Sequence, residues 1–347
     1  MRKVLFTLGA LTIAAVVPAP PAYSQPVPQN TEFPGAAARF ARATAGEYRE
    51  LARYPESSRA LKKGDVDPVK AKRLATRQSM RGPGGALPAL AVWASAVAYQ
   101  HPEPVDLFAQ LEAAPTAGVT VAELAGEISN AAGDLITAFS YQDEGKGADL
   151  RAGDGVYSAR VALPAGTEPD FADSFQVTAT ARLADGDLRQ AVGGFVYGKP
   201  AAQLTGRYRD GLRDGNVVIS AEVEVTESGR FHLAGTVHSL AGEPIGTAQS
   251  AVELTPGRHW IDLAFYGLMF HDRQVAGPFR LGSLALATTT RMPNALNDLV
   301  ENVHVTRAYR LPKLNAKAFG DARLTDAAGR LEAEARKLDI GTEVQQP

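Results

Sequence analysis

The chain has 347 residues, a formal net charge of −2 and 45% hydrophobic residues, a composition that is ordinary for a globular protein. A pI near 6.3 excludes the strongly basic character of nucleic-acid-binding or anionic-membrane-binding proteins, so we expect no nucleic-acid partner. Cysteine does not occur, which excludes disulfide bonds, thiolate metal sites and cysteine nucleophiles.

The N-terminus has the three parts of a secretory signal peptide. Arg2 and Lys3 precede an apolar run, Val4 to Val17, that is short for a membrane-spanning helix. Ala22-Tyr23-Ser24 then supplies the small-x-small pattern of a cleavage site. We predict a signal peptide over residues 1–24 and a periplasmic or secreted protein, not an integral membrane protein after cleavage. The alternative is an uncleaved N-terminal anchor.

Residues 25–85 are predicted to form a helical and extended N-terminal segment. The helix spans 36–53, because apolar side chains recur on one face until Tyr54-Pro55 ends the pattern. Residues 55–84 mix charges with glycine and proline, which indicates an extended connector.

The sequence of residues 86–199 indicates a series of strands. Apolar or alternating runs are separated by turn residues every ~8–15 positions, the pattern of an all-β sandwich. We predict an immunoglobulin-like β-sandwich here, with the architecture alone inferred because no cysteine pair is present. The expected strands are 90–94, 105–109, 119–128, 135–141, 156–163, 174–183 and 190–197.

A second β-sandwich is predicted over residues 200–311. Its clearest strand is 217–226, where Ile219, Ala221 and Val223 share one face and polar residues share the other. The fold class is therefore mainly β: two tandem immunoglobulin-like β-sandwich domains with short helical N- and C-terminal extensions. The further expected strands are 231–237, 246–254, 258–266, 279–288 and 300–309.

Residues 312–347 are predicted to be a C-terminal helical tail. Its apolar stripe is too short to indicate a coiled coil, so we expect a terminal helix packed on the second sandwich. A second hypothesis is that the two helical ends pack together on the sandwiches, or dock a partner. The stripe consists of Leu324, Ala328, Leu331, Ala335 and Leu338.

No pattern in the sequence identifies a catalytic residue. The six histidines include no i, i+4 pair, and no nucleophile elbow, P-loop or dinucleotide fingerprint occurs. His232 and His238 share a strand face, yet at ~3.3 Å per residue they lie ~20 Å apart, too far to hold one metal. We expect them to be solvated, and we expect Trp93 and Trp260 to lie in the cores.

The stretch Tyr141 to Pro164 is the most distinctive part of the chain, an acidic glycine-rich loop followed by an alternating strand. Asp143, Asp149 and Asp154 are candidate calcium ligands, since Ca²⁺ prefers several oxygens on a flexible loop. Their spacing is not that of an EF-hand. A turn cluster, in which Asp side chains accept backbone N–H groups and Gly adopts positive φ, is the favoured interpretation. No other cofactor is expected.

The run Gly153-Asp154-Gly155-Val156-Tyr157, with its outgoing strand, resembles a signature of bacterial exported proteins of the "choice-of-anchor" type. Residues 229–235 (GRFHLAG), 256–265 (PGRHWIDLAF) and 277–281 (GPFRL) are similar to a series in the same group. The resemblance covers about residues 86–311 and implies tandem immunoglobulin-like sandwiches in mostly uncharacterised periplasmic or secreted proteins. It brings no catalytic residues. The chain departs from the pattern of this group at Glu144, a position at which a second Asp is common in the group.

We therefore expect a non-enzymatic exported interaction or structural protein whose partner is a protein or polysaccharide of the cell envelope. One alternative is a carbohydrate- or polymer-binding module, which would present Trp or Tyr on a flat or grooved face. Another is a hydrolase with an interdomain site, which would show a deep pocket with perturbed acids or a histidine.

Overall fold

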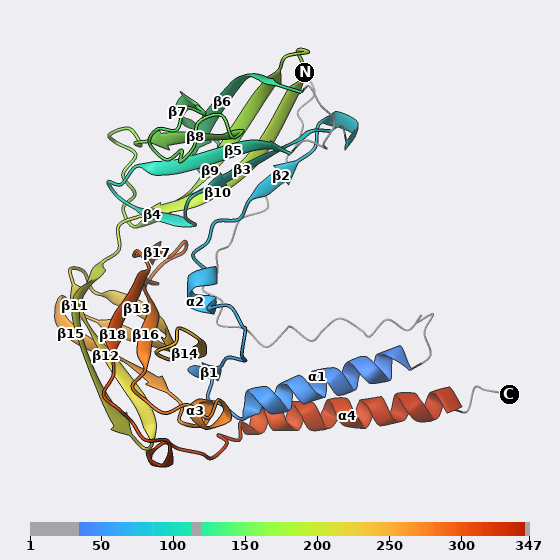
Figure 1. Ribbon diagram of the computed structural model, residues 1–347, viewed down its shortest axis with the longest axis vertical. Helices are drawn as coiled ribbons and strands as arrows, with labels where there is room; N and C mark the ends of the chain where they lie inside the picture. The colour runs from blue at the N-terminus through green and yellow to red at the C-terminus, as the bar shows by residue number, and fades with distance from the viewer. Residues whose placement is uncertain (1–34, 86, 113–118, 344–347) are drawn as a thin grey trace.

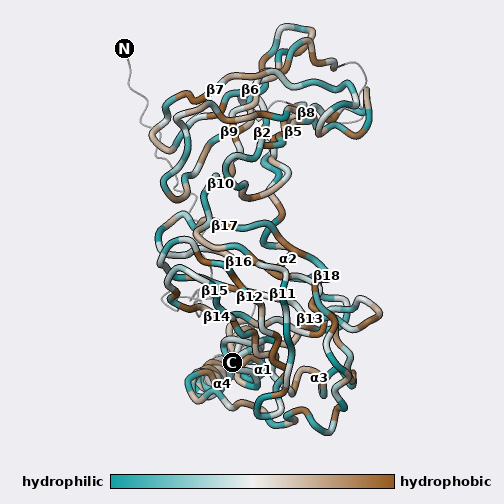
Figure 2. The backbone as a smooth tube through the Cα atoms, turned by 90° about the vertical axis from the view of Figure 1, so that its left-hand side faces the viewer, coloured by the Kyte–Doolittle hydropathy of each residue, from teal (hydrophilic) through white to brown (hydrophobic). Residues whose placement is uncertain are grey.

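The computed structural model describes residues 35–85, 87–112 and 119–343, so the predicted signal peptide lies outside the described residues. The protein is mainly β, which confirms the predicted fold class. Two sheet-built lobes are stacked along the long axis, and a pair of helices projects from the lower lobe (Figure 1). The view in Figure 2 looks nearly along these helices. Within the described ranges, no helix is both long and apolar enough to cross a membrane.

The first sandwich consists of a four-stranded sheet, β2-β3-β5-β8, and a five-stranded sheet, β4-β10-β9-β6-β7. Leu90 and Leu107 of the one sheet share a core with Val177 and Phe195 of the other. Neighbouring strands are antiparallel except that β4 runs parallel to β10. The elements are β2 (Gln78–Met80), the 3₁₀ turn Pro83–Gly85, β3 (Ala89–Ala94), β4 (Ala98–Gln100), β5 (Val105–Glu112), β6 (Val121–Ser129), β7 (Leu135–Ser140), β8 (Val156–Val161), β9 (Ala172–Leu183) and β10 (Leu188–Gly198).

The second sandwich pairs a six-stranded sheet, β1-β14-β13-β16-β17 with β18 beside β16, with a three-stranded sheet, β11-β12-β15. Ile219 and Leu263 share its core with Phe231 and Leu233. The elements are β1 (Ser58–Ala60), β11 (Ala202–Arg213), β12 (Asn216–Val225), β13 (Gly229–His238), β14 (Pro244–Leu254), β15 (Gly257–Phe265), α3 (Leu268–Asp272), β16 (Arg280–Thr288), β17 (Ala295–Leu296), β18 (Val300–Val305) and the 3₁₀ turn Leu311–Lys313.

The helices at the two ends of the chain, α1 (Ala36–Ala52) and α4 (Ala322–Glu343), form one antiparallel pair (Figure 1). Small side chains line their contact: Ala41 of α1 is buried with Ala335 of α4, and Ala45 is buried with Ala328. The two helical ends therefore pack together, but not in the predicted position on the sandwiches. The tail helix packs on α1 and not on a sandwich face.

The segment between α1 and β3, residues 53–88, contributes to both sandwiches, and we call it the strap. Its strand β1 pairs with β14 of the second sandwich, and its helix α2 (Pro68–Ala71) lies against β13 and β16. Its strand β2 then pairs with β3 of the first sandwich. The predicted extended connector is thus built into both sheet systems.

Asp67 fastens the strap to the second sandwich. It is the N-cap of α2, and its carboxylate also accepts a hydrogen bond from Thr236 Oγ1 at 2.7 Å and lies 3.1 Å from His238 Nε2. Burial by itself raises the pKa of Asp67, but the hydrogen bonds, led by that from His238, outweigh it and hold the pKa well below its usual range. His238 is therefore half-buried under the strap. The prediction that its side chain is solvated was wrong.

We expect Asp67→Asn to destabilise the protein by roughly 1.5–3 kcal/mol at pH 7, because charge-assisted hydrogen bonds are lost. Asparagine still caps a helix, so the variant isolates the charge. The folded pKa of Asp67 lies below the unfolded value of ~3.9, so its contribution is complete above that pH and is lost as the pH falls below it.

The test is urea unfolding as a function of pH. The stabilities of wild type and Asp67→Asn should converge in acid, and Asp65→Asn, an exposed change in the same segment, should have little effect at any pH. A gap between wild type and Asp67→Asn that does not change with pH would contradict the assigned role.

Candidate functional site

The acidic loop, residues 141–155, connects two strands that belong to different sheets of the first sandwich. It leaves β7, an edge of the five-stranded sheet, and enters β8, an edge of the four-stranded sheet. Gln142 and Ser158 exchange both backbone hydrogen bonds, at 2.9 and 2.8 Å, and so close the base of the loop. The loop therefore determines how the two sheet edges approach each other.

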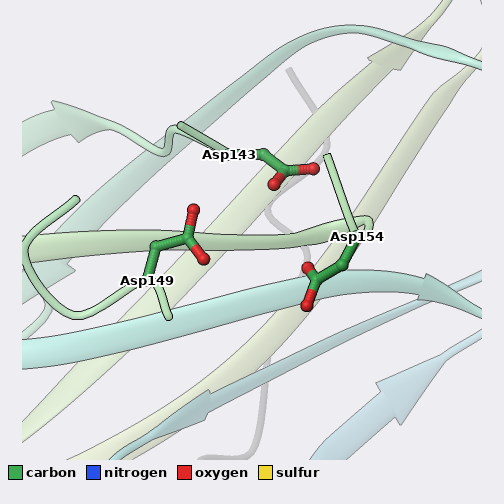
Figure 3. Close-up of side chains that lie close together, drawn as sticks. All are labelled: Asp143, Asp149 and Asp154. Atoms are coloured by element: carbon green, nitrogen blue, oxygen red, sulfur yellow. The ribbon is translucent and has the colours of Figure 1, made fainter. Parts of the chain in front are cut away.

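The three candidate calcium ligands lie together at one end of this loop (Figure 3). One carboxylate oxygen from each of Asp143, Asp149 and Asp154 lies within 4.8 Å of the others. Asp149 is buried, Asp143 is half-buried and Asp154 is exposed. The structure thus brings together three acids that the sequence separates by up to eleven positions.

Two of these carboxylates close the C-terminal part of the loop. Asp143 accepts backbone hydrogen bonds from Gly153 at 2.6 Å and from Gly155 at 3.0 Å. Asp154 accepts one from Val156 at 2.9 Å, an Asx turn that starts β8. These are the contacts that the turn-cluster interpretation requires.

Asp149 organises the other half of the loop, where it accepts backbone hydrogen bonds from Gly145 at 2.6 Å and from Arg151 at 3.0 Å. Gly145 has a φ of +67°, which suits glycine. Each carboxylate has about four lone-pair sites, so these amides leave sites free on all three acids. Since Ca–O distances of ~2.3–2.6 Å place opposite ligands up to ~5 Å apart, the cluster has a spacing that one Ca²⁺ ion can span.

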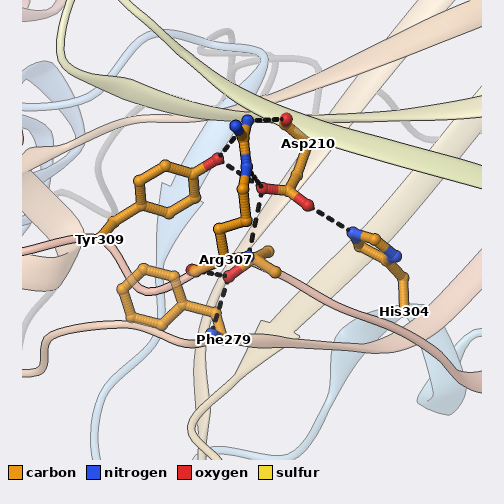
Figure 4. Close-up of polar contacts among 6 residues, drawn as sticks. Asp210, Phe279, His304, Arg307 and Tyr309 are labelled. Atoms are coloured by element: carbon orange, nitrogen blue, oxygen red, sulfur yellow. Dashed lines mark hydrogen bonds and ion pairs between the residues drawn. The ribbon is translucent and has the colours of Figure 1, made fainter.

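A second polar cluster joins two sheet edges of the second sandwich (Figure 4). Asp210 of β11 lies 2.8 Å from His304 Nε2 of β18 and 3.1 Å from Arg307 Nε, and it also accepts a hydrogen bond from the Tyr309 hydroxyl. Burial raises the pKa of Tyr309, with the Asp210 carboxylate adding to the effect, to about 12.

The Asp210 cluster has the character of a structural clamp. Burial raises the pKa of Asp210, but the hydrogen bonds from Tyr309, His304 and Arg307 outweigh it and lower that pKa overall. The cluster links β11, an edge of the three-stranded sheet, to β18 in the facing sheet. Sequence reasoning missed it, because no spacing rule relates Asp210 to residues more than ninety positions away.

Several single-residue expectations need correction. Trp93 and Trp260 are half-buried, and each carries a guanidinium over its ring, that of Arg77 at 4.4 Å and that of Arg209 at 4.3 Å from the ring centroid. They do not lie in the cores, because both occupy positions that alternate with core residues on their strands. His232 is also half-buried, with Nε2 3.4 Å from Gln249, and burial lowers its pKa.

Fold and site together define a mainly β protein of several sheets with an aspartate cluster on a loop between sheet edges. Residues 201–303 match the family model described as "Domain of unknown function (DUF4785) C-terminal domain". This range covers most of the second sandwich. The choice-of-anchor resemblance and the immunoglobulin-like classification stay predictions. No curated protein matches the chain.

Among solved structures, the chain is similar to a DUF4785 family protein from Legionella pneumophila, with 17% identity and a TM-score of 0.47 over 64% of this chain and 59% of that one. The chain therefore spans less than two thirds of that relative. It is also similar to a tetra-tandem repeat from the extending region of a large adhesion protein, with 13% identity and a TM-score of 0.23 over 70% and 57% of the two chains. These TM-scores are too low to support any statement about function.

The loop fold makes a testable distinction between two glycines. Gly145 and Gly147 both have a φ of +67°, but a Cβ at Gly145 would lie 2.9 Å from the Ala152 nitrogen, whereas one at Gly147 would meet no atom within 4 Å. We expect Gly147→Ala to cost ~1–2 kcal/mol of stability from backbone strain alone. Gly145→Ala should cost a further ~1–3 kcal/mol, because the added methyl group is overpacked. Chemical denaturation measures both, and equal losses would show that the loop is not folded in this way.

Proposed function

We propose that the protein is an exported, non-enzymatic interaction protein in which the acidic loop binds Ca²⁺ and fixes one end of the first sandwich. The observation that carries the proposal is the convergence of Asp143, Asp149 and Asp154 within 4.8 Å on a loop that joins two sheets. A cation there would offset the repulsion among three carboxylates, one of which is buried. The signal-peptide pattern of residues 1–24 supports export, to the periplasm or the cell exterior.

The polar clusters of the second sandwich support a non-enzymatic role. Asp67 and Asp210 are half-buried acids with lowered pKa values, but hydrogen-bond partners from neighbouring elements surround both carboxylates. A general base needs a free lone pair aimed at a substrate. Their geometry therefore favours holding the fold together over proton transfer.

The metal part of the proposal is tested by thermal melting with calcium. Extracellular calcium modules have Kd values of ~0.1–1 mM, so 10 mM Ca²⁺ should stabilise the folded protein by about 1.4–2.7 kcal/mol. We expect a rise in Tm of several degrees that Asp154→Asn abolishes. Asp154 is the best position, since an asparagine there retains the Asx turn to Val156 and removes only the charge.

The matched control is Asp185→Asn. Asp185 forms the same kind of turn, accepting a hydrogen bond from the Asp187 nitrogen at 3.0 Å, and it lies outside the acidic loop. This variant should keep the full calcium response. No change in Tm at 10 mM Ca²⁺, relative to NaCl of equal ionic strength, would remove the metal from the proposal.

The interaction part is tested in cells that express the full chain with a C-terminal tag. After cross-linking, we expect the tagged protein in the envelope or medium, bound to an envelope protein or polysaccharide. A variant that lacks residues 1–24 should stay in the cytoplasm without these partners. Recovery of the full chain from the cytoplasm would contradict export, and turnover of an envelope polymer by the purified protein would contradict the non-enzymatic role.

A further inference from the structure

The three-stranded sheet of the second sandwich carries a polar groove with a volume of about 490 Å³. This volume lies within the ~300–1,000 Å³ of small-molecule sites. All three strands of the sheet contribute to it: Gln203 comes from β11, Glu222 and Glu224 come from β12, and Arg258 comes from β15. The two glutamates alternate with core residues of β12, so the groove lies on the side of the sheet that faces away from the core.

A bulge in β11 forms one wall of the groove. The register between β11 and β12 breaks between Leu204 and Tyr208, so residues 205–207 all stand opposite Glu222. Gly206 permits this path, because its φ is +79°. The bulge directs the Thr205 hydroxyl to the Glu222 carboxylate, to which it donates at 2.9 Å. It also interrupts the regular edge of β11, which disfavours an added peptide strand at this place.

The charges in the groove cancel each other. Glu222 forms the floor, with a side chain that is only 6% exposed, and Arg207 Nη1 lies 3.3 Å from its carboxylate. At the rim, Arg258 Nε lies 3.1 Å from the carboxylate of Glu224. These two acids and two guanidinium groups are the charged side chains of the lining, so its formal charge is zero. Charge complementarity therefore favours an uncharged ligand.

The hydrogen-bonding groups of the groove match a ligand that is rich in hydroxyls. A carboxylate has about four acceptor sites and a guanidinium has five N–H donors, so the two ion pairs leave part of this capacity unused. Arg207 and Arg258 are 65% and 63% exposed, which keeps their donors accessible. Leu204 is the single aliphatic residue of the lining, and no aromatic residue lines it. The groove thus lacks the apolar anchor pocket of a protein-binding site, and a sugar suits it better.

We propose that this groove binds a neutral polysaccharide of the cell envelope, with one sugar unit above Glu222. The Glu222 carboxylate would accept hydrogen bonds from sugar hydroxyls, and Arg207 and Arg258 would donate to sugar oxygens. Trp260 is paired with Glu222 across β15 and β12, so its half-buried ring lies beside the bound unit. The inference rests on the proposed interaction role and specifies a site and a partner class for it.

The test combines fluorescence and calorimetry on the mature protein, residues 25–347. The chain has two tryptophans, so Trp93→Phe leaves Trp260 as the only one. Chitohexaose, cellohexaose, laminarihexaose and maltohexaose serve as neutral probes, and hexagalacturonate serves as the anionic one. We expect at least one neutral hexasaccharide to change the Trp260 emission, with the same Kd that calorimetry gives. The corresponding monosaccharide should bind more weakly, because it makes fewer contacts.

Two variants check the site. Arg258→Ala should weaken binding about tenfold to a hundredfold, because a charge-assisted hydrogen bond is lost. Glu222→Gln keeps an acceptor for Thr205 but removes the charge, and it should weaken binding by a similar factor. The matched control is Arg182→Ala, which breaks an equally exposed cross-strand pair with Glu123 in the first sandwich and should bind as the wild type does. If Glu222→Gln does not fold, Arg258→Ala decides the question.

Other outcomes overturn the inference. No binding of any neutral hexasaccharide, equally tight binding of hexagalacturonate, or binding without a change in Trp260 emission would each do so. A monosaccharide that binds as tightly as its hexasaccharide would assign the groove to a free sugar and remove the polymer. Shortening of the hexasaccharide would also contradict the non-enzymatic role. An envelope partner that is retained by Arg258→Ala would leave the interaction role standing and remove only this site.

Discussion

The arrangement of the whole molecule depends on the strap and on the half-buried carboxylate of Asp67 that fastens it. The strap contributes β1 and α2 to the second sandwich, although it precedes the strands of the first sandwich in the sequence. The second sandwich is therefore discontinuous in sequence, and the chain passes between the lobes twice, through the strap and again through Lys199-Pro200. Two crossings restrain relative rotation far more than a single linker would.

Contacts at the junction add to this restraint. Val196 and Ala172 of the first sandwich are buried with Ala295 of the second, and the Arg291 guanidinium lies 5.0 Å from the centre of the Phe171 ring. The helix pair α1 and α4 follows from the same chain path, because the strap begins where α1 ends and the residues before α4 bond to its first residue, the Phe319 nitrogen donating to the Arg53 oxygen at 2.9 Å. Alanines at the helix contact then allow close packing without a large apolar stripe.

Much of the fold could be predicted because apolar and polar side chains alternate along its strands. β12 illustrates this, with Ile219, Ala221 and Val223 in the core and polar residues on the opposite face, although the structure buries Ser220 and Glu222 of that face as well. β11 was missed, since a bulge between Leu204 and Tyr208 breaks its alternation and its exposed face is rich in arginine. β1 and β2 have three residues each, too few to show a period. Their existence depends on pairing partners far away in the chain.

The site could be predicted only as far as it is local. Three aspartates and their glycines within one loop were recognisable, and they converge because their carboxylates bond backbone amides of that loop and of Val156, the first residue of β8. The Asp210 clamp could not be predicted, because it depends on which strands become sheet edges. The prediction that the two tryptophans lie in the cores was wrong for a related reason. An arginine on a neighbouring segment covers each outward-facing ring, so the ring does not need a place in the core.

The acidic loop and the two strand ends that it joins, those of β7 and β8, are one mechanical unit. Asp143 follows directly after Gln142, the last residue to pair with β8. Its carboxylate holds the amides of Gly153 and Gly155, within the last three residues before β8. The position of this one side chain thus sets the distance between the ends of β7 and β8. A cation shared with Asp149 and Asp154 would stiffen that closure from the opposite side, because it would tie both halves of the loop to Asp143.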